Sequence, residues 1–211
     1  MLFANPTAAE LAGIIVALVI GITFHEFSHA LVADQLGDHR PRALGRVSLN
    51  PLHHLDPVGS LLFLVAGFGW GKPVPVNAYA LRPGRTGLTF VALAGPAANF
   101  VVAAVIALLF RALQLAGLLD ADFPRVVVAS IVYFNIILGL LNLIPIPPLD
   151  GYNVVLPLLP PRQQFVVQRY AQYGILILLL LVFLSSFSPG GGPLDWLFGF
   201  GQGLARLMLG T

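Results

Sequence analysis

Four long apolar segments constrain this chain more than any other feature of its sequence. A helix needs about 20 apolar residues to cross a bilayer, and each segment reaches that length. Hydrophobic residues make up 57% of the 211 residues and charged residues only 9%, well below the roughly 25% that is usual in soluble domains. We therefore expect an all-α polytopic membrane protein with about four to six transmembrane helices. The segments cover approximately residues 9–36, 88–118, 126–149 and 165–187.

The first apolar segment carries ionisable residues where hydrocarbon contacts are expected. His25, Glu26 and His29 form the pattern H-E-x-x-H, and the spacing of the two histidines puts them on one face of a helix. In this pattern both histidines bind Zn²⁺ and the glutamate acts as general base on a water molecule. A second interpretation is a pair of core histidines hydrogen-bonded to neighbouring helices, with Glu26 as their counter-ion. The apolar surroundings favour the metal site, because ionisable residues inside a membrane are costly and usually functional.

The third apolar segment ends in a second polar group. Pro145, Pro147 and Pro148 break the helix just before Asp150 and Gly151. Irregular backbone at membrane depth is tolerated where it is buried in protein or lines a cavity, so the carboxylate of Asp150 can turn inward. A helix stop followed by an Asp-Gly turn is the simpler interpretation. Next to a histidine pair, however, Asp150 is the best candidate for a third ligand, since a chain without cysteine must hold metal with His and carboxylate.

Asn99 lies in the second apolar segment, shortly after Gly95 and Pro96. The proline frees backbone groups that neighbours must satisfy, so we expect a kink packed against the rest of the protein. Asn99 either lines a polar cavity, where it is a candidate for substrate binding, or makes an interhelical hydrogen bond that holds the bundle together.

The polar connection between the first two apolar segments combines several short patterns. Residues 46–49 include Val47, and residues 72–76 alternate Pro with Val, which indicates short strands or extended edges and a small β element at the cytoplasmic face. Residues 58–70 are apolar but too short to span, so we expect a re-entrant or interfacial segment. His53 and His54 are either extra ligands or part of a solvated turn, and we favour the turn.

The distribution of basic residues predicts the orientation in the membrane. Six lie in the connection after the first apolar segment and two follow the third, whereas the other connections hold only Arg111 and Arg125. By the positive-inside rule, both rich connections are cytoplasmic. The first and third segments then run in the same direction. His25, His29 and Asp150 are expected at comparable depth, toward the cytoplasmic ends of parallel helices.

The rest of the chain offers no chemical group for a site. A Gly-rich linker leads to a short amphipathic tail at residues 194–209, which we expect at the membrane interface. We expect one integral membrane domain over residues 1–211, with its core at 9–155 and C-terminal helices at 165–209. The N-terminus lacks the basic n-region of a cleavable signal peptide, so the first apolar segment is expected to be retained. A net charge of only +2 gives no indication of nucleic acid binding.

Three motifs together resemble the signatures of the site-2 protease family of intramembrane zinc metalloproteases, peptidase family M50. They are residues 24–29, Gly95–Asn99 and Asn142–Gly151. Residues 50–51, 54–59 and 69–77 are also similar to compact prokaryotic members, and the resemblance spans about residues 20–155. We recognise no PDZ insertion and no nucleotide-sensing CBS module.

The resemblance implies a role for each site residue. His25, His29 and Asp150 would bind one zinc ion per chain. Glu26 would be the catalytic base. Asn142 matches a family residue that contacts the backbone of the substrate.

The resemblance therefore implies a zinc metalloendopeptidase that cleaves within or near transmembrane segments of membrane-protein substrates, in regulated intramembrane proteolysis. The substrate must unwind locally, and an unpaired strand edge in the first polar connection could hold it extended. The expected location is the inner membrane of a prokaryotic cell, with the site toward the cytoplasm. A metal or proton transporter is one alternative, although neither ionisable residues in several spans nor repeat symmetry is visible. A catalytically inactive membrane scaffold is the other.

Overall fold

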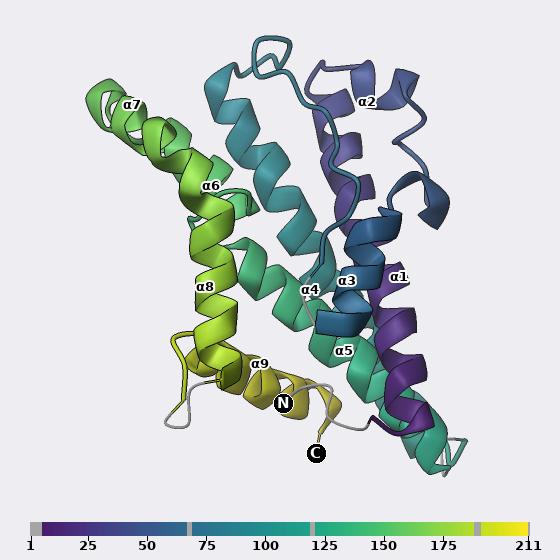
Figure 1. Ribbon diagram of the computed structural model, residues 1–211. Helices are drawn as coiled ribbons and strands as arrows, with labels where there is room; N and C mark the ends of the chain where they lie inside the picture. The colour runs from purple at the N-terminus through teal and green to yellow at the C-terminus, as the bar shows by residue number, and fades with distance from the viewer. Residues whose placement is uncertain (1–5, 67–68, 119–120, 188–190, 211) are drawn as a thin grey trace.

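The computed structural model describes residues 6–66, 69–118, 121–187 and 191–210. Within these ranges the chain forms helices and no strand, as Figure 1 shows. Four helical stretches are long and apolar enough to cross a membrane, which confirms the expected all-α polytopic fold. They are α1 (Ala8–Gln35), α4 (Arg85–Leu115), α5 (Asp122–Asn142) and the stretch formed by α7 (Pro161–Tyr170), the 3₁₀ turn Ala171–Tyr173 and α8 (Gly174–Phe187).

Helices α1, α4 and α5 pack against one another and form the centre of the bundle (Figure 1). Gly13 of α1 lies against Ser130 of α5, and Gly21 lies against Asn135 and Leu138 further along the same helix. Small residues let two helix backbones approach closely. Because both contacts advance in the same chain direction, α1 and α5 are parallel, as expected from the charge distribution.

The C-terminal helix α9 (Asp195–Leu209) packs across α5 and α4. Its inner residues Ala205 and Leu209 belong to one buried cluster with Phe110 and Ile136. The tail expected at the membrane interface is therefore also part of the helix bundle. Its depth in the membrane stays a prediction.

The connection between α1 and α4 contains α2 (Arg40–Ala43), the 3₁₀ turn Pro51–His53 and α3 (Pro57–Ala66). The expected strands at 46–49 and 72–76 are absent from the described residues, where no ladder forms and one isolated β-bridge joins Leu55 and Gly71. The alternative of extended edges stays a prediction. Prolines in the second segment have no N–H group and cannot donate to a ladder. The expected re-entrant segment begins as α3, and its residues 67–68 lie outside the described residues.

Hydrogen bonds connect the extended segment 72–77 to residues that follow α1 and to the loop before it. Asp38 is buried, accepts hydrogen bonds from the Arg40 guanidinium at 2.8 and 2.9 Å, and accepts another from the backbone N–H of Asn77 at 2.6 Å. The Arg40 bonds hold the pKa of Asp38 at about 2. At the other end of the segment, the backbone N–H of Lys72 donates to the carbonyl of His54 at 2.7 Å.

Candidate metal centre

The described residues contain one group of three potential metal ligands, formed by His25, His29 and Asp150. Oδ2 of Asp150 lies 3.0 Å from Nε2 of His25 and 3.2 Å from Nε2 of His29. The two Nε2 atoms lie 3.0 Å apart, and both histidines are buried. Residues from the first and third apolar segments therefore converge on one point.

Local backbone geometry brings Asp150 to this point. Helix α5 ends at Asn142, and the Pro-rich turns lead into the short helix α6 (Asp150–Val155), which the 3₁₀ turn Leu156–Leu158 extends. Gly151 packs so closely on the turn that follows α5 that a Cβ atom would lie 2.5 Å from the carbonyl oxygen of Ile144. A glycine at this position lets Asp150 open α6 beside the histidines.

Helix α4 orients both imidazole rings. Nδ1 of His25 lies 2.7 Å from Oδ1 of Asn99, and Nδ1 of His29 lies 2.7 Å from the backbone carbonyl of Val91. Both partners are hydrogen-bond acceptors, so each Nδ1 must donate. A neutral ring then presents the lone pair of Nε2, which is the atom that faces Asp150 in both cases.

The chemistry of this cluster fits a bound cation. Oδ2 of Asp150 is buried and has no hydrogen-bond partner, and it faces two nitrogen lone pairs, so the three acceptor atoms repel one another unless a positive charge lies between them. Tetrahedral zinc with His and carboxylate ligands holds the ligand atoms about 3.3 Å apart. The observed separations of 3.0–3.2 Å are close to this value. Three protein ligands would leave a fourth position open, which is the arrangement of catalytic zinc sites.

Gly95 of α4 packs directly against the imidazole rings of His25 and His29. A Cβ atom at this position would lie 2.6 Å from Cε1 of His25 and closer still to Nε2 of His29. The motif glycine is therefore needed for the close approach of α4 to the site.

Glu26 lies next to the cluster on α1 and is half-buried. Its Oε1 atom faces Gly71, where a Cβ atom would lie 3.3 Å from it. The bare backbone of Gly71 thus passes beside the carboxylate that the sequence predicts as the base.

Two buried polar side chains, Arg46 and His54, lie near Gly71 and Lys72; Arg46 was not predicted as part of this region, and His54 was expected in a solvated turn. Arg46 is buried and donates through Nη2 to the carbonyl of Lys72, and its Nε has no hydrogen-bond partner. Burial lowers the pKa of Arg46, and the nearby charge of Glu26 opposes this effect. The solvated-turn interpretation is wrong for His54, which is fully buried with Nε2 2.6 Å from the Ser48 carbonyl. Burial lowers the pKa of His54 as well.

The two asparagines proposed for substrate binding occupy different environments. Asn99 is fully buried and contacts His25, so the interhelical hydrogen bond expected as one alternative is present. Asn142 is half-buried at the end of α5, where its amide nitrogen donates to the carbonyl of Leu138 at 2.9 Å. A contact of either residue with substrate stays a prediction. His53, on the surface, bonds to the Gly45 carbonyl at 2.6 Å.

Asn135 is linked to the site through Asn99 and was not predicted from the sequence as part of it. Its Oδ1 atom lies 3.1 Å from the amide nitrogen of Asn99. An amide inside an apolar helix is the signal that could have indicated this role.

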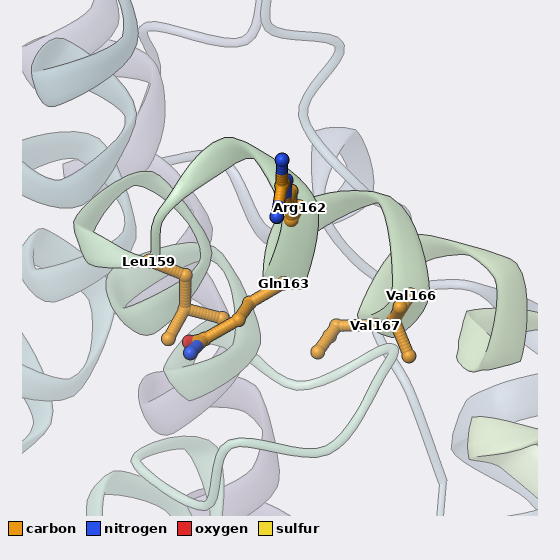
Figure 2. Close-up of a pocket in the computed structure, with 5 residues that line it drawn as sticks. All are labelled: Leu159, Arg162, Gln163, Val166 and Val167. Carbon is orange, nitrogen blue, oxygen red and sulfur yellow. The ribbon is translucent and has the colours of Figure 1, made fainter.

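A hollow of about 410 Å³ lies along α7, and none of the site residues lines it. Figure 2 shows its lining, which is mostly apolar: Leu159, Arg162, Gln163, Val166 and Val167. We assign no chemistry to it.

Comparison with known proteins identifies similar sequences. Residues 116–185 match the model of peptidase family M50, a span that includes Asp150 but not the H-E-x-x-H motif. YwhC of Bacillus subtilis is 36% identical over 177 residues, which cover 80% of this chain and 78% of that protein. Rip2 of Mycobacterium tuberculosis is 33% identical over 202 residues, covering 89% of this chain and 74% of that protein. The names of both describe them as candidate zinc metalloproteases. No solved structure gives a significant match.

Proposed function

The chain belongs to peptidase family M50, the site-2 proteases, and we propose that it cleaves transmembrane segments of other membrane proteins at the cluster of His25, His29 and Asp150. It is an integral membrane zinc metallopeptidase, and the part of the chain that the structure describes contains four apolar helical stretches long enough to span. The observation that carries the proposal is the convergence of two Nε2 atoms and one carboxylate oxygen inside the helix bundle.

The three residues of the cluster would hold the zinc ion through Nε2 of His25, Nε2 of His29 and Oδ2 of Asp150. Zinc held there supplies a Lewis acid that polarises a carbonyl group and lowers the pKa of water toward about 7. Val91 and Asn99 support this assignment, because their oxygens turn both imidazoles toward the common point.

Glu26 would act as the base. Its carboxylate takes a proton from the attacking water and passes it to the amine that leaves when the peptide bond breaks. The half-buried position beside the ligands suits this role, and Oε1 faces the bare backbone of Gly71. We propose one domain for residues 1–211, with a core at 9–155 that carries every one of these residues and C-terminal helices at 165–209.

The substrate would bind as an extended chain. A helical peptide bond is hidden by its own hydrogen bonds, so cleavage needs local unwinding. The extended segment 72–77 is held at both ends by Asp38 and His54 and has no ladder partner in the described residues. A substrate strand could add to its edge, forming the small β element expected from the sequence, while Asn142 bonds to the substrate backbone.

The membrane arrangement completes the proposal. Arg40 and Arg42 lie shortly after the C-terminal end of α1, the end nearer to His29. The positive-inside rule therefore favours a site near the cytoplasmic face of a prokaryotic inner membrane. Helix α3, about 15 Å long, is too short to span and is proposed to be re-entrant or interfacial.

The test compares wild type with Glu26→Gln in detergent, using a generic transmembrane substrate and measuring bound zinc alongside cleavage. The variant keeps the three ligands and removes the base, so we expect about one zinc per chain and no cleavage. Glu10→Gln is the matched control, since Glu10 lies exposed at the start of the same helix and only caps it. It should cleave like wild type. Absence of zinc, or equal cleavage by wild type and Glu26→Gln, would overturn the proposal and favour a transporter or a scaffold.

A further inference from the structure

We propose that Asn135 of α5 is a positioning residue of the metal centre, which acts through Asn99 to determine which nitrogen of His25 carries the proton. The inference rests on the proposed function, in which Nε2 of His25 is a ligand atom. It follows from a chain of hydrogen bonds that crosses three helices.

The chain of hydrogen bonds begins at a backbone carbonyl of α5. Asn135 is 1% exposed, and its amide nitrogen donates to the carbonyl of Ile131, one turn earlier, at 2.9 Å. A carbonyl can only accept, so this bond determines which end of the Asn135 amide is the nitrogen. The oxygen of that amide therefore faces α4.

The second link is Asn99 on α4, which is fully buried. Its amide nitrogen donates to Oδ1 of Asn135 at 3.1 Å and to the backbone carbonyl of Gly21 on α1 at 3.1 Å. Both partners are acceptors, so the NH₂ group must face them. The oxygen of Asn99 is thereby turned toward His25.

The third link is the imidazole of His25. Its Nδ1 lies 2.7 Å from Oδ1 of Asn99, which can only accept, so Nδ1 must carry the hydrogen. In a neutral ring Nε2 then keeps its lone pair toward Asp150. With the Asn99 amide reversed, an NH₂ group would face Nδ1 and the hydrogen would move to Nε2, where it blocks binding of a cation.

The other histidine shows why Asn135 is needed. His29 donates directly to a backbone carbonyl, that of Val91, whose polarity cannot reverse. A side-chain amide can flip, so Asn99 needs a partner that prevents it. Oδ1 of Asn135 and the Gly21 carbonyl together accept from the Asn99 NH₂ group, and Asn135 is the side chain of this pair, itself held by its own helix.

The test examines the metal-free protein first. With ¹⁵N-labelled histidine at alkaline pH, the imidazole nitrogen shifts and couplings in NMR report the tautomer of His25. We expect the Nδ1–H form in wild type and a substantial Nε2–H population in Asn135→Leu, which has a similar size but no amide. The zinc affinity of Asn135→Leu should fall by about 10–100-fold, as is typical when a partner of a metal-binding histidine is removed.

Ser130→Ala is the matched control. Ser130 lies on the same helix and bonds in the same way to the carbonyl four residues earlier, Val126, at 2.9 Å. Removal of the Ser130 hydroxyl should leave the His25 tautomer and the zinc affinity unchanged. This comparison separates a general effect of altering α5 from the specific effect of losing Asn135.

Two results would overturn the inference: an Nε2–H tautomer of His25 in folded wild type, or an unchanged tautomer and zinc affinity in Asn135→Leu. The first needs no variant, so the inference remains testable if Asn135→Leu does not fold. If wild type has the expected tautomer but binds no zinc, the proposed function fails while the hydrogen-bond chain stands.

Discussion

Gly95 of α4 lies directly against the imidazole of His29 on α1, with the ring of His25 on the same side. A Cβ atom added to Gly95 would lie 2.6 Å from Cε1 of either ring, closer than side chains approach in folded proteins. Both rings are buried and tied to α4 through Nδ1, so they cannot withdraw without losing those bonds. We therefore predict that Gly95→Ala displaces the Nε2 atoms and abolishes zinc binding, measured as metal content after purification.

A control for Gly95→Ala is available on α9. Gly203 is helical and has open space where a Cβ atom would be added. Gly203→Ala should keep full zinc content and be slightly more stable, by up to about 1 kcal/mol. A Gly95→Ala protein that binds zinc like wild type would show that the rings have more freedom than their contacts imply.

Removal of zinc should destabilise the protein, because three acceptor atoms are then left facing one another at 3.0–3.2 Å. A ligand that binds only the folded state at 1,000 times its Kd contributes about 4 kcal/mol, which is roughly 8–16 °C in Tm for a chain of this size. We expect zinc to raise the Tm of the chelator-treated protein by such an amount. Glu26→Gln should retain the shift and Asp150→Asn should lose most of it. A zinc-dependent shift that survives in Asp150→Asn would place the metal elsewhere.

Gly71 is predicted to control access to Glu26 without contributing to metal binding. Its Cβ position lies 2.8 Å from Cγ2 of Ile22 and 3.3 Å from Oε1 of Glu26, so Gly71→Ala must push the extended segment away from the carboxylate. A shift of this kind near reacting groups can cost about 100-fold in rate. We expect cleavage to fall by 10- to 100-fold with zinc content unchanged. Equal cleavage would mean that the backbone at Gly71, which leads into segment 72–77, is not part of the substrate path. Gly199→Ala, in open space on α9, is the control for a Gly→Ala substitution.

The spans and the ligand candidates could be predicted because they depend on local sequence. Apolar length predicts a transmembrane helix, and the spacing of His25 and His29 places them on one face wherever that helix packs. The prolines before Asp150 end the helix because proline has no backbone N–H group to donate to the preceding turn. The positive-inside rule then predicted parallel helices, which the contacts of Gly13 and Gly21 with α5 confirm.

The remaining features depend on tertiary contacts that local patterns do not contain. Strands were expected at 46–49 and 72–76, but Pro73 and Pro75 of the second segment lack the N–H groups that a ladder needs. His54 follows a polar turn in the sequence, yet it is fully buried between the loop and segment 72–77. Asn135 gains its role only through Asn99, a residue 36 positions away on another helix.

The ion pair between Asp38 and Arg40 predicts a specific loss of stability in acid. The Arg40 guanidinium holds the pKa of folded Asp38 at about 2, below its usual value near 3.9. A carboxyl whose pKa is lowered by folding stabilises the protein above its unfolded pKa, and this contribution is lost as the pH falls toward the folded pKa. The contribution of Asp38 should therefore be complete above about pH 4 and disappear near pH 2. Asp38→Asn should lower the unfolding free energy by about 1–3 kcal/mol at neutral pH, since Asp38 is buried and also accepts from the backbone of Asn77.

The measurement is the difference in thermal stability between wild type and Asp38→Asn from pH 7 to pH 2, with both proteins metal-free so that acid release of zinc does not contribute. The difference should shrink below pH 4. In an Arg40→Gln background it should be smaller throughout, because the bidentate partner is already gone. A difference that stays constant across this range would mean that Asp38 stabilises the junction of α1 with segment 72–77 through its shape and backbone contact rather than through its charge.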